Sequence, residues 1–467
     1  MKINENYVYF LDVNKPTMNE LICWFMVENT DLCDKMQNSR HAVTTNEPNP
    51  YHTGDNSIWT HTMMVCQRAE IDECNKIVLL AALLHDLGKP MAREEIPFEA
   101  KKPVHSESNE LRNEGLHDGK TSGLQKVVPP SGKKVHMRGH EGLSFYLAVK
   151  VLNSLKEMGV VNEHEMIEVL SIISMHGTLF DSIDKDGNMR KPEKVFAKFP
   201  LNERGMEFFK NFVQQVKNDS LGRFFVSKDG RKNQATYLGT EIFTASQFAI
   251  YCMEHGYPNL RKRPTNANIT VLIGPPAVGK TTWREANVGP DDVVVSRDDI
   301  MEQYAVENSI IGTEVDCHVC KGDGFNTVIS FNAGPVDHDC YNCKATGKSK
   351  VKNYSELWKY LEDNNLHKEI DVILQTTFKE AVKANKNVVI DMTNMSRKTR
   401  RKWLANVPKN YSKTAVVFAV DYEEILKRSN NRNKETGKYI SPLVIKQLAK
   451  GFMVPTYDEV DKIEWIF

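Results

Sequence analysis

The sequence lacks a long apolar run, an excess of charge of either sign and a large number of cysteines. Its longest unbroken apolar stretch is Ile77–Leu84, eight residues, whereas a membrane-spanning helix needs about 20. That stretch therefore predicts a buried segment of a folded core, and no membrane is expected as a partner. The 61 basic residues balance the 61 acidic ones, which excludes a polycation. Any contact with nucleic acid must therefore come from local basic clusters.

The N-terminal segment also lacks the pattern of a secretory signal, in which basic residues precede an apolar stretch. We therefore expect a reducing, cytoplasmic setting. Nine cysteines are present, and four of them form two CxxC pairs. The remaining five are scattered, most of them among apolar neighbours, as reduced core thiols are: Cys23, Cys33, Cys66, Cys74 and Cys252.

A chain of 467 residues is longer than one hydrophobic core usually supports, so two or more domains are expected. Up to about residue 255 the apolar spacing is helical. The helical segments are 57–70, 76–87, 140–157, 163–176 and 203–221. The polar stretch at about 93–134 predicts an exposed loop or hairpin. His255–Asn268, with two prolines, marks the expected joint between domains.

Beyond that joint, short β-rich runs alternate with helical ones, which predicts a parallel sheet with crossover helices. The β-rich runs are Ile269–Ile273, Val293–Val295, Val388–Ile390 and Ala415–Val420. The fold class expected is multidomain. An all-α domain at 1–260 (the front half) precedes an α/β domain at 266–467 (the back half), into which a small zinc-binding segment at 312–350 is inserted.

The octapeptide GPPAVGKT, from Gly274 to Thr281, matches the phosphate-binding pattern GxxxxGK[ST] in full. An expected strand precedes it and an expected helix follows Gly279, so backbone N–H groups and a helix N-terminus can hold phosphates. Lys280 is placed to reach the β- and γ-phosphate oxygens of ATP, and Thr281 to bind Mg²⁺. Thr282 is the next candidate for contact with the nucleotide. A chance flexible turn is the alternative.

The second β-rich run leads into the sequence VVVSRDDIM at Val293–Met301. A carboxylate at the tip of a strand beside the phosphate loop could take a proton from an acceptor hydroxyl. Asp298 is therefore the candidate general base, and Asp299 its solvated neighbour. The alternative is a helix N-terminus enriched in acidic residues by the helix dipole.

Two basic segments follow the later strands. Five of the six residues at 397–402 are basic, and they could contact a phosphate backbone near the acceptor or form a solvated helix face. Arg428 and Arg432 lie four residues apart and share a helix face. Two guanidiniums there could close over a transferred phosphoryl group, although an ordinary surface helix explains the same spacing.

The phosphate loop, Arg297–Asp298, the DxTN of Asp391–Asn394 and the KRxxxR of Lys427–Arg432 together resemble the 5′-hydroxyl polynucleotide kinase family over about 266–467. The resemblance implies that Asp298 is the base and that Arg432 contacts the transferred phosphate. The candidate substrate-binding residues are Arg297, Asp391, Asn394, Arg397, Arg400 and Arg401. One departure is Met301, which stands where the family usually has an arginine for the acceptor's phosphate. Acceptor binding is then weaker or supplied elsewhere.

The CxxC pairs have the spacing of a tetrahedral zinc site. Nineteen residues separate the two pairs, Cys317/Cys320 and Cys340/Cys343. Each pair opens a glycine-containing turn and resembles the CxxCxGxG repeat of chaperone zinc fingers. Four thiolates leave no open position on the ion, so a structural Zn²⁺ is expected, with free or redox-active thiols as the alternative. The lysine-rich exit from the insertion motivates the hypothesis that it extends the acceptor groove.

In the front half, His85 and Asp86 close the buried segment IVLLAALLHD. A buried acid beside a buried histidine is costly unless each has a partner, and a metal ion is one such partner. Four further candidate ligands stand at expected helix sites: His61, His140, His176 and Asp219. Any one of them alone is more simply explained as a hydrogen-bonded core residue. Their number and positions favour a metal centre.

The order H…HD…H…H…D resembles the HD phosphohydrolase superfamily over about 50–225, and YHTGDNSIWTHT is especially like the HD domain of some tRNA nucleotidyltransferases. The first ion implied by the resemblance is held by His61, His85, Asp86 and Asp219. A second is held by His140 and His176, with Asp86 as the bridge. Such ligands suit Mn²⁺, Co²⁺, Ni²⁺ or Fe²⁺ as well as Zn²⁺. Lys89 could help to hold a phosphate, or be a surface lysine.

An HD domain in front of a polynucleotide kinase domain resembles the bifunctional HD-domain polynucleotide kinases, which heal broken RNA ends. That resemblance implies removal of 2′-, 3′- or 2′,3′-cyclic phosphate by the front half and ATP-dependent phosphorylation of a 5′-hydroxyl by the back half. Nucleic-acid ends, with RNA favoured over DNA, and a separate ligase are the partners implied. The alternatives are an HD nucleotidase joined to a nucleoside or nucleotide kinase, and a nucleic-acid sensor switched by ATP.

Overall fold

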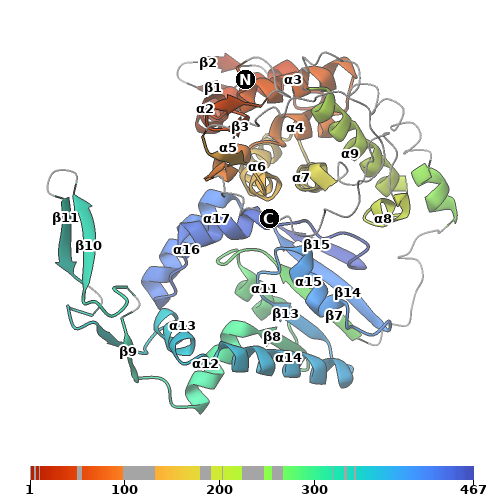
Figure 1. Ribbon diagram of the computed structural model, residues 1–467. Coiled ribbons are helices and arrows are strands. Elements are labelled where there is room, and N and C mark those ends of the chain that lie inside the picture. The colour runs from red at the N-terminus through yellow and green to blue at the C-terminus, as the bar shows by residue number, and fades with distance from the viewer. Residues whose placement is uncertain are drawn as a thin grey trace, which may run out of the picture.

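The computed structural model shows a helical front half packed against an α/β back half (Figure 1). The described residues are 2–4, 7–9, 11–49, 55–97, 132–178, 191–201, 203–222, 247–254, 267–317, 319–330, 334–340 and 343–467. Most of the polar stretch at 93–134 and of the joint at His255–Asn268 lies outside these residues.

Helices form most of the front half, as the apolar spacing predicts. They are α1 (Met18–Glu28), α2 (Thr30–Asn38), α3 (Ile58–Ile71), α4 (Lys76–Leu84), α5 (Lys89–Ala92), α6 (His140–Glu157), α7 (Glu163–Met175), the 3₁₀ turn η1 (His176–Thr178), α8 (Pro192–Phe196) and α9 (Glu203–Leu221). Residues 247–254 are also helical. Among the described helices, none combines the length and apolarity that a bilayer crossing requires.

Side-chain caps fix where the two central helices begin. The hydroxyl of Ser57 accepts the N–H of Thr60 at 3.0 Å at the start of α3, and the side chain of Asn75 accepts the N–H of Val78 at 3.1 Å at the start of α4. From Val78 to Leu84 every side chain of α4 is buried. This helix therefore lies inside the bundle and delivers the residues that follow it, His85 and Asp86, to the interior.

The front half is not all-α, which corrects the predicted fold class. Strands β1 (Lys2–Asn4) and β2 (Tyr7–Tyr9) pair with each other, and a second antiparallel sheet has the order β4-β3-β6-β5. Its strands are β3 (Ala42–Thr44), β4 (Glu47–Pro48), β5 (Glu94–Ile96) and β6 (Lys134–His136). Strands of two or three residues are too short to show the alternation by which a strand is predicted.

The back half is built on a five-stranded sheet in which all neighbouring strands are parallel, in the order β15-β14-β7-β13-β8. The strands are β7 (Ala267–Ile273), β8 (Val293–Ser296), β13 (Val388–Asp391), β14 (Tyr411–Phe418) and β15 (Lys462–Ile466). The helices are α11 (Lys280–Asn287), α12 (Arg297–Glu307), α13 (Tyr354–Asp363), α14 (His367–Lys383), α15 (Arg397–Leu404), α16 (Tyr422–Thr436) and α17 (Pro442–Lys450). Strand β15, of sequence KIEWI, was not predicted, because it alternates charged and apolar residues over only five positions.

Parallel strands bring their carboxyl ends to one edge of a sheet, where ligands bind in such folds. Here that edge carries the phosphate loop after β7, Asp298 after β8 and Asp391 at the end of β13. The sheet order therefore collects candidate site residues that lie more than a hundred positions apart in the sequence.

The two halves meet along α6 and α17, which approach each other closely. A Cβ atom at Gly142 would lie 2.2 Å from the carbonyl oxygen of Ala449, so only glycine fits there. The rings of Phe145 and Phe452 pack with their centroids 4.4 Å apart. The buried residues of both halves form one continuous apolar cluster.

The insertion stands between α12 and α13. Strands β9 (Glu314–Asp316) and β12 (Lys348–Lys350) pair at its base, and the hairpin of β10 (Phe325–Ser330) and β11 (Gly334–Asp339) projects away from the sheet (Figure 1). A second apolar cluster lies under this base and includes Met301, Val351 and Leu357.

Candidate active sites

Six side chains from α3, α9 and the ends of the intervening helices converge in the front half. This histidine cluster comprises His61, His85, Asp86, His140, His176 and Asp219. In each of the four imidazoles, Nδ1 faces a backbone carbonyl oxygen and Nε2 faces the centre of the cluster. The carbonyl pairs are His61–Gly222 (3.2 Å), His85–Ala82 (2.9 Å), His140–Met137 (3.0 Å) and His176–Ile173 (2.7 Å). A proton on Nδ1 then donates to the carbonyl and leaves the Nε2 lone pair for a ligand.

Asp86 lies at the middle of the cluster. Its Oδ2 is 3.6 Å from His61 Nε2 and 3.2 Å from His85 Nε2, and its Oδ1 is 3.4 Å from His140 Nε2. Asp219 Oδ1 lies 3.0 Å from His61 Nε2. Two triads of possible ligand atoms therefore share Asp86. One contains His61 and His85, and the other His140 and His176; within each triad all ligand atoms lie within 4.8 Å of one another.

Three polar atoms at the middle of the cluster, on His85 and Asp86, are buried without a hydrogen-bond partner among the described residues. His85 and Asp86 have no exposed surface. Within the described part of the chain, the two carboxylate oxygens of Asp86 make no hydrogen bond of normal geometry. The same is true of His85 Nε2. The ammonium of Lys89 is 2.6 Å from Asp86 Oδ2 but approaches it only as an ion pair. A fully buried carboxylate that accepts no hydrogen bond is costly, so these side chains fit a bound divalent ion.

The electrostatics favour the same interpretation. Burial lowers the pKa of His61 and His176, and lowers that of His140 to about 4. Burial also opposes protonation of His85, but the carboxylates of Asp86 and Asp219 outweigh it and raise its pKa. The pKa of Asp86 is held well below its usual range, because His85 and Lys89 outweigh the effect of burial. His61, His140 and His176 are thus kept neutral beside an ionised carboxylate, the protonation states in which these groups bind metals, whereas His85 would have to lose its proton to bind one.

One residue near this cluster was missed by sequence reasoning. The ring of His41 packs edge-on against His61, with centroids 5.5 Å apart, and is buried. It lies next to a three-residue strand rather than on an apolar helix face, so no periodicity distinguished it.

In the back half, the phosphate loop runs from β7 to the start of α11. Gly279 has a φ of 100°, a left-handed conformation that favours glycine. The ammonium of Lys280 donates to the carbonyl oxygens of Gly274 and Pro275 at 2.8 Å each, so it lies across its own loop. Burial lowers its pKa to about 8. Thr281 and Thr282 follow in the first turn of α11, and both are exposed.

Asp298 lies in the first turn of α12, on the same edge of the sheet as Lys280. The hydroxyl of Tyr354 donates to its Oδ1 at 2.9 Å, and the ammonium of Lys438 pairs with its Oδ2. That ammonium also lies 3.8 Å from the centre of the Tyr354 ring. Neither partner of Asp298 was predicted, since one follows the insertion and the other lies beyond α16.

Arg284 of α11 joins the two remaining carboxylates of this edge. Its Nη1 lies 2.7 Å from Asp299 and 3.1 Å from Asp391. Burial raises the pKa of Asp391, although Lys280 and Arg284 counteract it. Arg432 is close enough to Lys280 for its charge to lower the pKa of that lysine.

The family comparison agrees with this geometry. Residues 269–455 match a family described as an AAA domain. Together with the parallel sheet and the phosphate loop, the match fits a P-loop kinase. We therefore call this part of the chain the kinase-like domain. A domain of this kind implies ATP and Mg²⁺ as its ligands. No curated protein gives a significant match to the chain.

In the kinase-like domain, two residues expected to bind substrate have structural positions instead. Arg400 is fully buried, and its guanidinium binds Glu459 through two bonds of 3.0 and 2.9 Å and three backbone carbonyls besides. The amide of Asn394 is also buried and donates to the carbonyl of Leu272 at 2.9 Å. Both fix the turn between β13 and α15. The sequence could not distinguish the buried Arg400 from the exposed Arg401, because both are cations of the same helix.

The other basic candidates are partly or fully exposed. Arg397 pairs with Asp458, and Arg401 is exposed on α15. Arg428 donates to Glu424 at 2.8 Å, one turn back on α16. Arg297 pairs with Asp371, approaches His367 at 3.2 Å and lies over the ring of Trp358 at 5.6 Å. Trp358, on α13 and 38% exposed, is a second aromatic near Asp298 that sequence reasoning did not select.

The departure at Met301 has a structural reason. Its side chain is fully buried in the apolar cluster under the insertion, with Val351 and Leu357 among its neighbours. An arginine there would put a charge into an apolar site. The methionine is therefore part of the apolar cluster that supports the insertion.

The four cysteines of the insertion converge. All are buried, and their sulfur atoms lie within 4.8 Å of one another. The Sγ atoms of Cys317 and Cys340 are 3.7 Å apart, and those of Cys320 and Cys343 are 3.6 Å apart. The N–H of Gly324 donates to Cys320 Sγ at 3.2 Å. A four-thiolate set of this kind could bind zinc in a closed, structural site.

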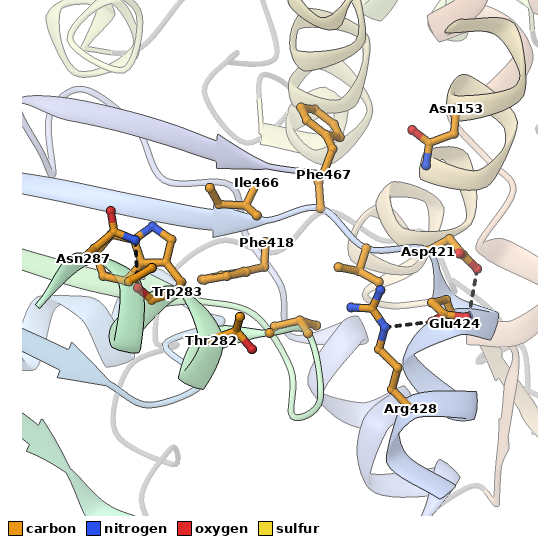
Figure 2. Close-up of a pocket in the computed structure, with 15 residues that line it drawn as sticks. Asn153, Thr282, Trp283, Asn287, Phe418, Asp421, Glu424, Arg428, Ile466 and Phe467 are labelled. Atoms are coloured by element: carbon orange, nitrogen blue, oxygen red, sulfur yellow. Dashed lines mark hydrogen bonds and ion pairs between the residues drawn. The ribbon is translucent and has the colours of Figure 1, made fainter. Parts of the chain in front are cut away.

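A cavity of about 500 Å³ opens beside the phosphate loop (Figure 2). Gly279, Thr282 and Trp283 line it at the loop, and Phe418 lines it at the end of β14. Its lining also includes Arg428 of α16, Phe467 after β15 and Asn153 of α6. The last of these belongs to the front half.

Proposed function

We propose that the protein heals nucleic-acid ends. The kinase-like domain phosphorylates a 5′-hydroxyl end with ATP, and the front half removes phosphate from a 2′, 3′ or 2′,3′-cyclic phosphate end. The observation that carries the proposal is the convergence of four imidazole Nε2 atoms on a buried Asp86 in a different half from the phosphate loop. A kinase alone has no use for this second cluster, whereas end healing requires two phosphate reactions.

In the front half, His61, His85, Asp86 and Asp219 would hold one divalent ion, and Asp86, His140 and His176 a second. Ions bound there supply an activated water and neutralise the charge of a phosphoester. The ammonium of Lys89, 2.6 Å from Asp86, is placed to bind a phosphate oxygen. The backbone carbonyls behind the imidazoles keep each Nε2 aimed at the centre, so little rearrangement is required on binding.

In the kinase-like domain, Lys280 would leave its loop carbonyls for the β- and γ-phosphates, with Mg²⁺ at Thr281. Asp298 then accepts the proton of the 5′-hydroxyl while the hydroxyl oxygen attacks the γ-phosphorus. The bond between the γ-phosphorus and the oxygen that bridges it to the β-phosphate breaks, and ADP is released. Tyr354 and Lys438 have to give up at least one oxygen of Asp298 before that step. Arg432, which is close enough to Lys280 for the two charges to interact, would stabilise the charge of the transferred phosphoryl group.

A polynucleotide acceptor is favoured by the surface next to Asp298. Trp358 is partly exposed there, with the guanidinium of Arg297 over its ring, and aromatic rings of this kind stack nucleobases. Arg401 adds an exposed positive charge on α15. A mononucleoside could stack on the same ring but carries no phosphate for these guanidiniums, so the positive charges are what favour a polynucleotide.

Transfer of label from γ-³²P-ATP tests the proposal. Label on a 5′-hydroxyl oligonucleotide supports it, label on a mononucleoside alone favours a small-molecule kinase, and no label on either favours an ATP-switched sensor. Release of phosphate from RNA with a 3′-phosphate or 2′-phosphate end, measured in the presence of Mn²⁺, tests the front half separately. Absence of release with every divalent ion would contradict the two-reaction account.

A further inference from the structure

The cavity beside the phosphate loop is completed by both halves of the protein. Lys280 and Thr281 hold the phosphate end of a nucleotide, so its base extends away from them. In Figure 2, Asn153 of α6 lies across the cavity from Thr282, while Phe418, Ile466 and Phe467 supply apolar surface between them. A cavity of about 500 Å³ with aromatic walls has the size and chemistry of a nucleobase site.

We propose that Asn153, a residue of the front half, reads the adenine base of ATP bound to the kinase-like domain. A carboxamide can accept from the N6 amino group of adenine through its oxygen and donate to a ring nitrogen through its NH₂ group, as asparagine does when it binds adenine bidentately. The inference rests on nucleotide binding at the phosphate loop and does not depend on the acceptor.

The position of α6 against the kinase-like domain is fixed well enough for such recognition. Lys150, one turn before Asn153, forms an ion pair of 2.6 Å with Glu423 in the first turn of α16. The ammonium of Lys156 lies 5.6 Å from the centre of the Phe467 ring. These contacts lie on either side of Asn153, and the glycine contact at Gly142 holds the beginning of the helix.

The same helix begins at His140 of the histidine cluster. Asn153 lies thirteen positions after His140, which corresponds to about 20 Å along a helix axis. Nucleotide bound through Asn153 would therefore hold the front half in place against the kinase-like domain, through the helix that also contributes to the second centre.

Asn153→Ala tests the inference, with Ser154→Ala as the matched control. Ser154 is exposed on the same turn, and its hydroxyl bonds to its own helix at Lys150. Loss of two hydrogen bonds to the base should weaken ATP binding by about tenfold, measured by titration calorimetry on the full chain. The control should bind as the wild-type protein does.

Asn153→Asp gives the sharper result, because a carboxylate only accepts hydrogen bonds. Guanine offers two donors on its Watson–Crick edge and adenine does not, so this variant should bind GTP relatively better than ATP. Wild-type ATP affinity in Asn153→Ala, together with an unchanged ATP-to-GTP ratio in Asn153→Asp, would overturn the inference.

Hydrogen exchange provides a readout without catalysis. Amides in the second half of α6 should exchange more slowly when ATP is added to the wild-type protein, and this protection should be reduced in Asn153→Ala. If ATP protected only the phosphate loop, α6 would not contact the nucleotide. Failure of oligonucleotide labelling, by contrast, would affect the proposed polynucleotide acceptor and leave these binding results unchanged.

Discussion

The two candidate centres of this protein are built in opposite ways. In the histidine cluster, ligand atoms come from positions between 61 and 219, the side chains are buried or nearly so, and each imidazole is held from behind by a backbone carbonyl. In the kinase-like domain the phosphate loop is one continuous segment, and the charged groups pair with each other at a partly open edge. The side chain of Asp298 is 43% exposed and that of Arg428 is 45% exposed.

This difference indicates how each centre responds to its ligand. The first has its ligand atoms in place around Asp86, with the ammonium of Lys89 close to that carboxylate as a side-chain cation that an ion would displace, so binding an ion requires little movement. The second has charges that already neutralise one another, as Lys438 does for Asp298 and Arg284 for Asp391. Substrates have to replace these ion pairs with their own contacts, so side chains of this centre have to move during the reaction.

The largest effect is expected from Asp298→Asn, which removes the base from the mobile centre. Phosphoryl transfer to an oligonucleotide should fall by about 10²–10⁴-fold, whereas phosphate release by the front half should be unchanged. Rates of both reactions on the same preparation provide the measurement. Asp299→Asn is the control, since that carboxylate points to Arg284 and should matter much less. Equal losses in the two variants would contradict a base role for Asp298.

Asp86→Asn should have the converse effect. Removal of a ligand shared by both triads should lower phosphate release by at least about 100-fold, since even the loss of an indirect metal partner costs 10–100-fold. Labelling of 5′-hydroxyl ends should persist. Elemental analysis should show that this variant loses the divalent metal proposed for the histidine cluster and keeps any zinc held by the four cysteines. Glu168→Gln, at another buried acid of the front half, should change neither reaction nor metal content.

A smaller effect is expected from Tyr354→Phe, which removes one hydrogen bond to Asp298 and keeps the ring under Lys438. Phosphoryl transfer should fall by about tenfold, the effect of one hydrogen bond to a charged group. Steady-state rates with saturating ATP measure this. Phosphate release should not change. A rate equal to that of the wild-type protein would show that Lys438 alone orients the base.

The smallest effect concerns Glu168 and the pH dependence of the protein's thermal stability. Burial raises the pKa of this carboxyl, although Asn211 donates to it at 2.7 Å. A raised pKa in the folded state means that its contribution to stability is present below the unfolded value and is lost as pH rises through the folded one. Glu168→Gln should therefore raise the melting temperature at pH 7 by roughly 2 °C and leave it unchanged at pH 4, as scanning calorimetry would show.

Sequence patterns predicted those parts of the molecule that depend on neighbouring residues. The phosphate loop is contiguous, and the helices of the front half follow from apolar spacing. The order of histidines and aspartates suggested a common centre, but only the structure shows that every Nδ1 faces a carbonyl. Arg400 could not be told from Arg401 by sequence, because burial of one arginine depends on Glu459, which is distant in the chain. The partners of Asp298 and the contribution of Asn153 to the cavity depend on tertiary packing in the same way.

The contact at Gly142 has a consequence for how the protein folds. Because a single methyl group there would strike the carbonyl of Ala449, and because Phe145 and Phe452 share one apolar cluster, neither half presents a finished surface without the other. Cutting the chain at the joint would expose aromatic rings to water. The two halves are therefore expected to unfold in a single cooperative transition.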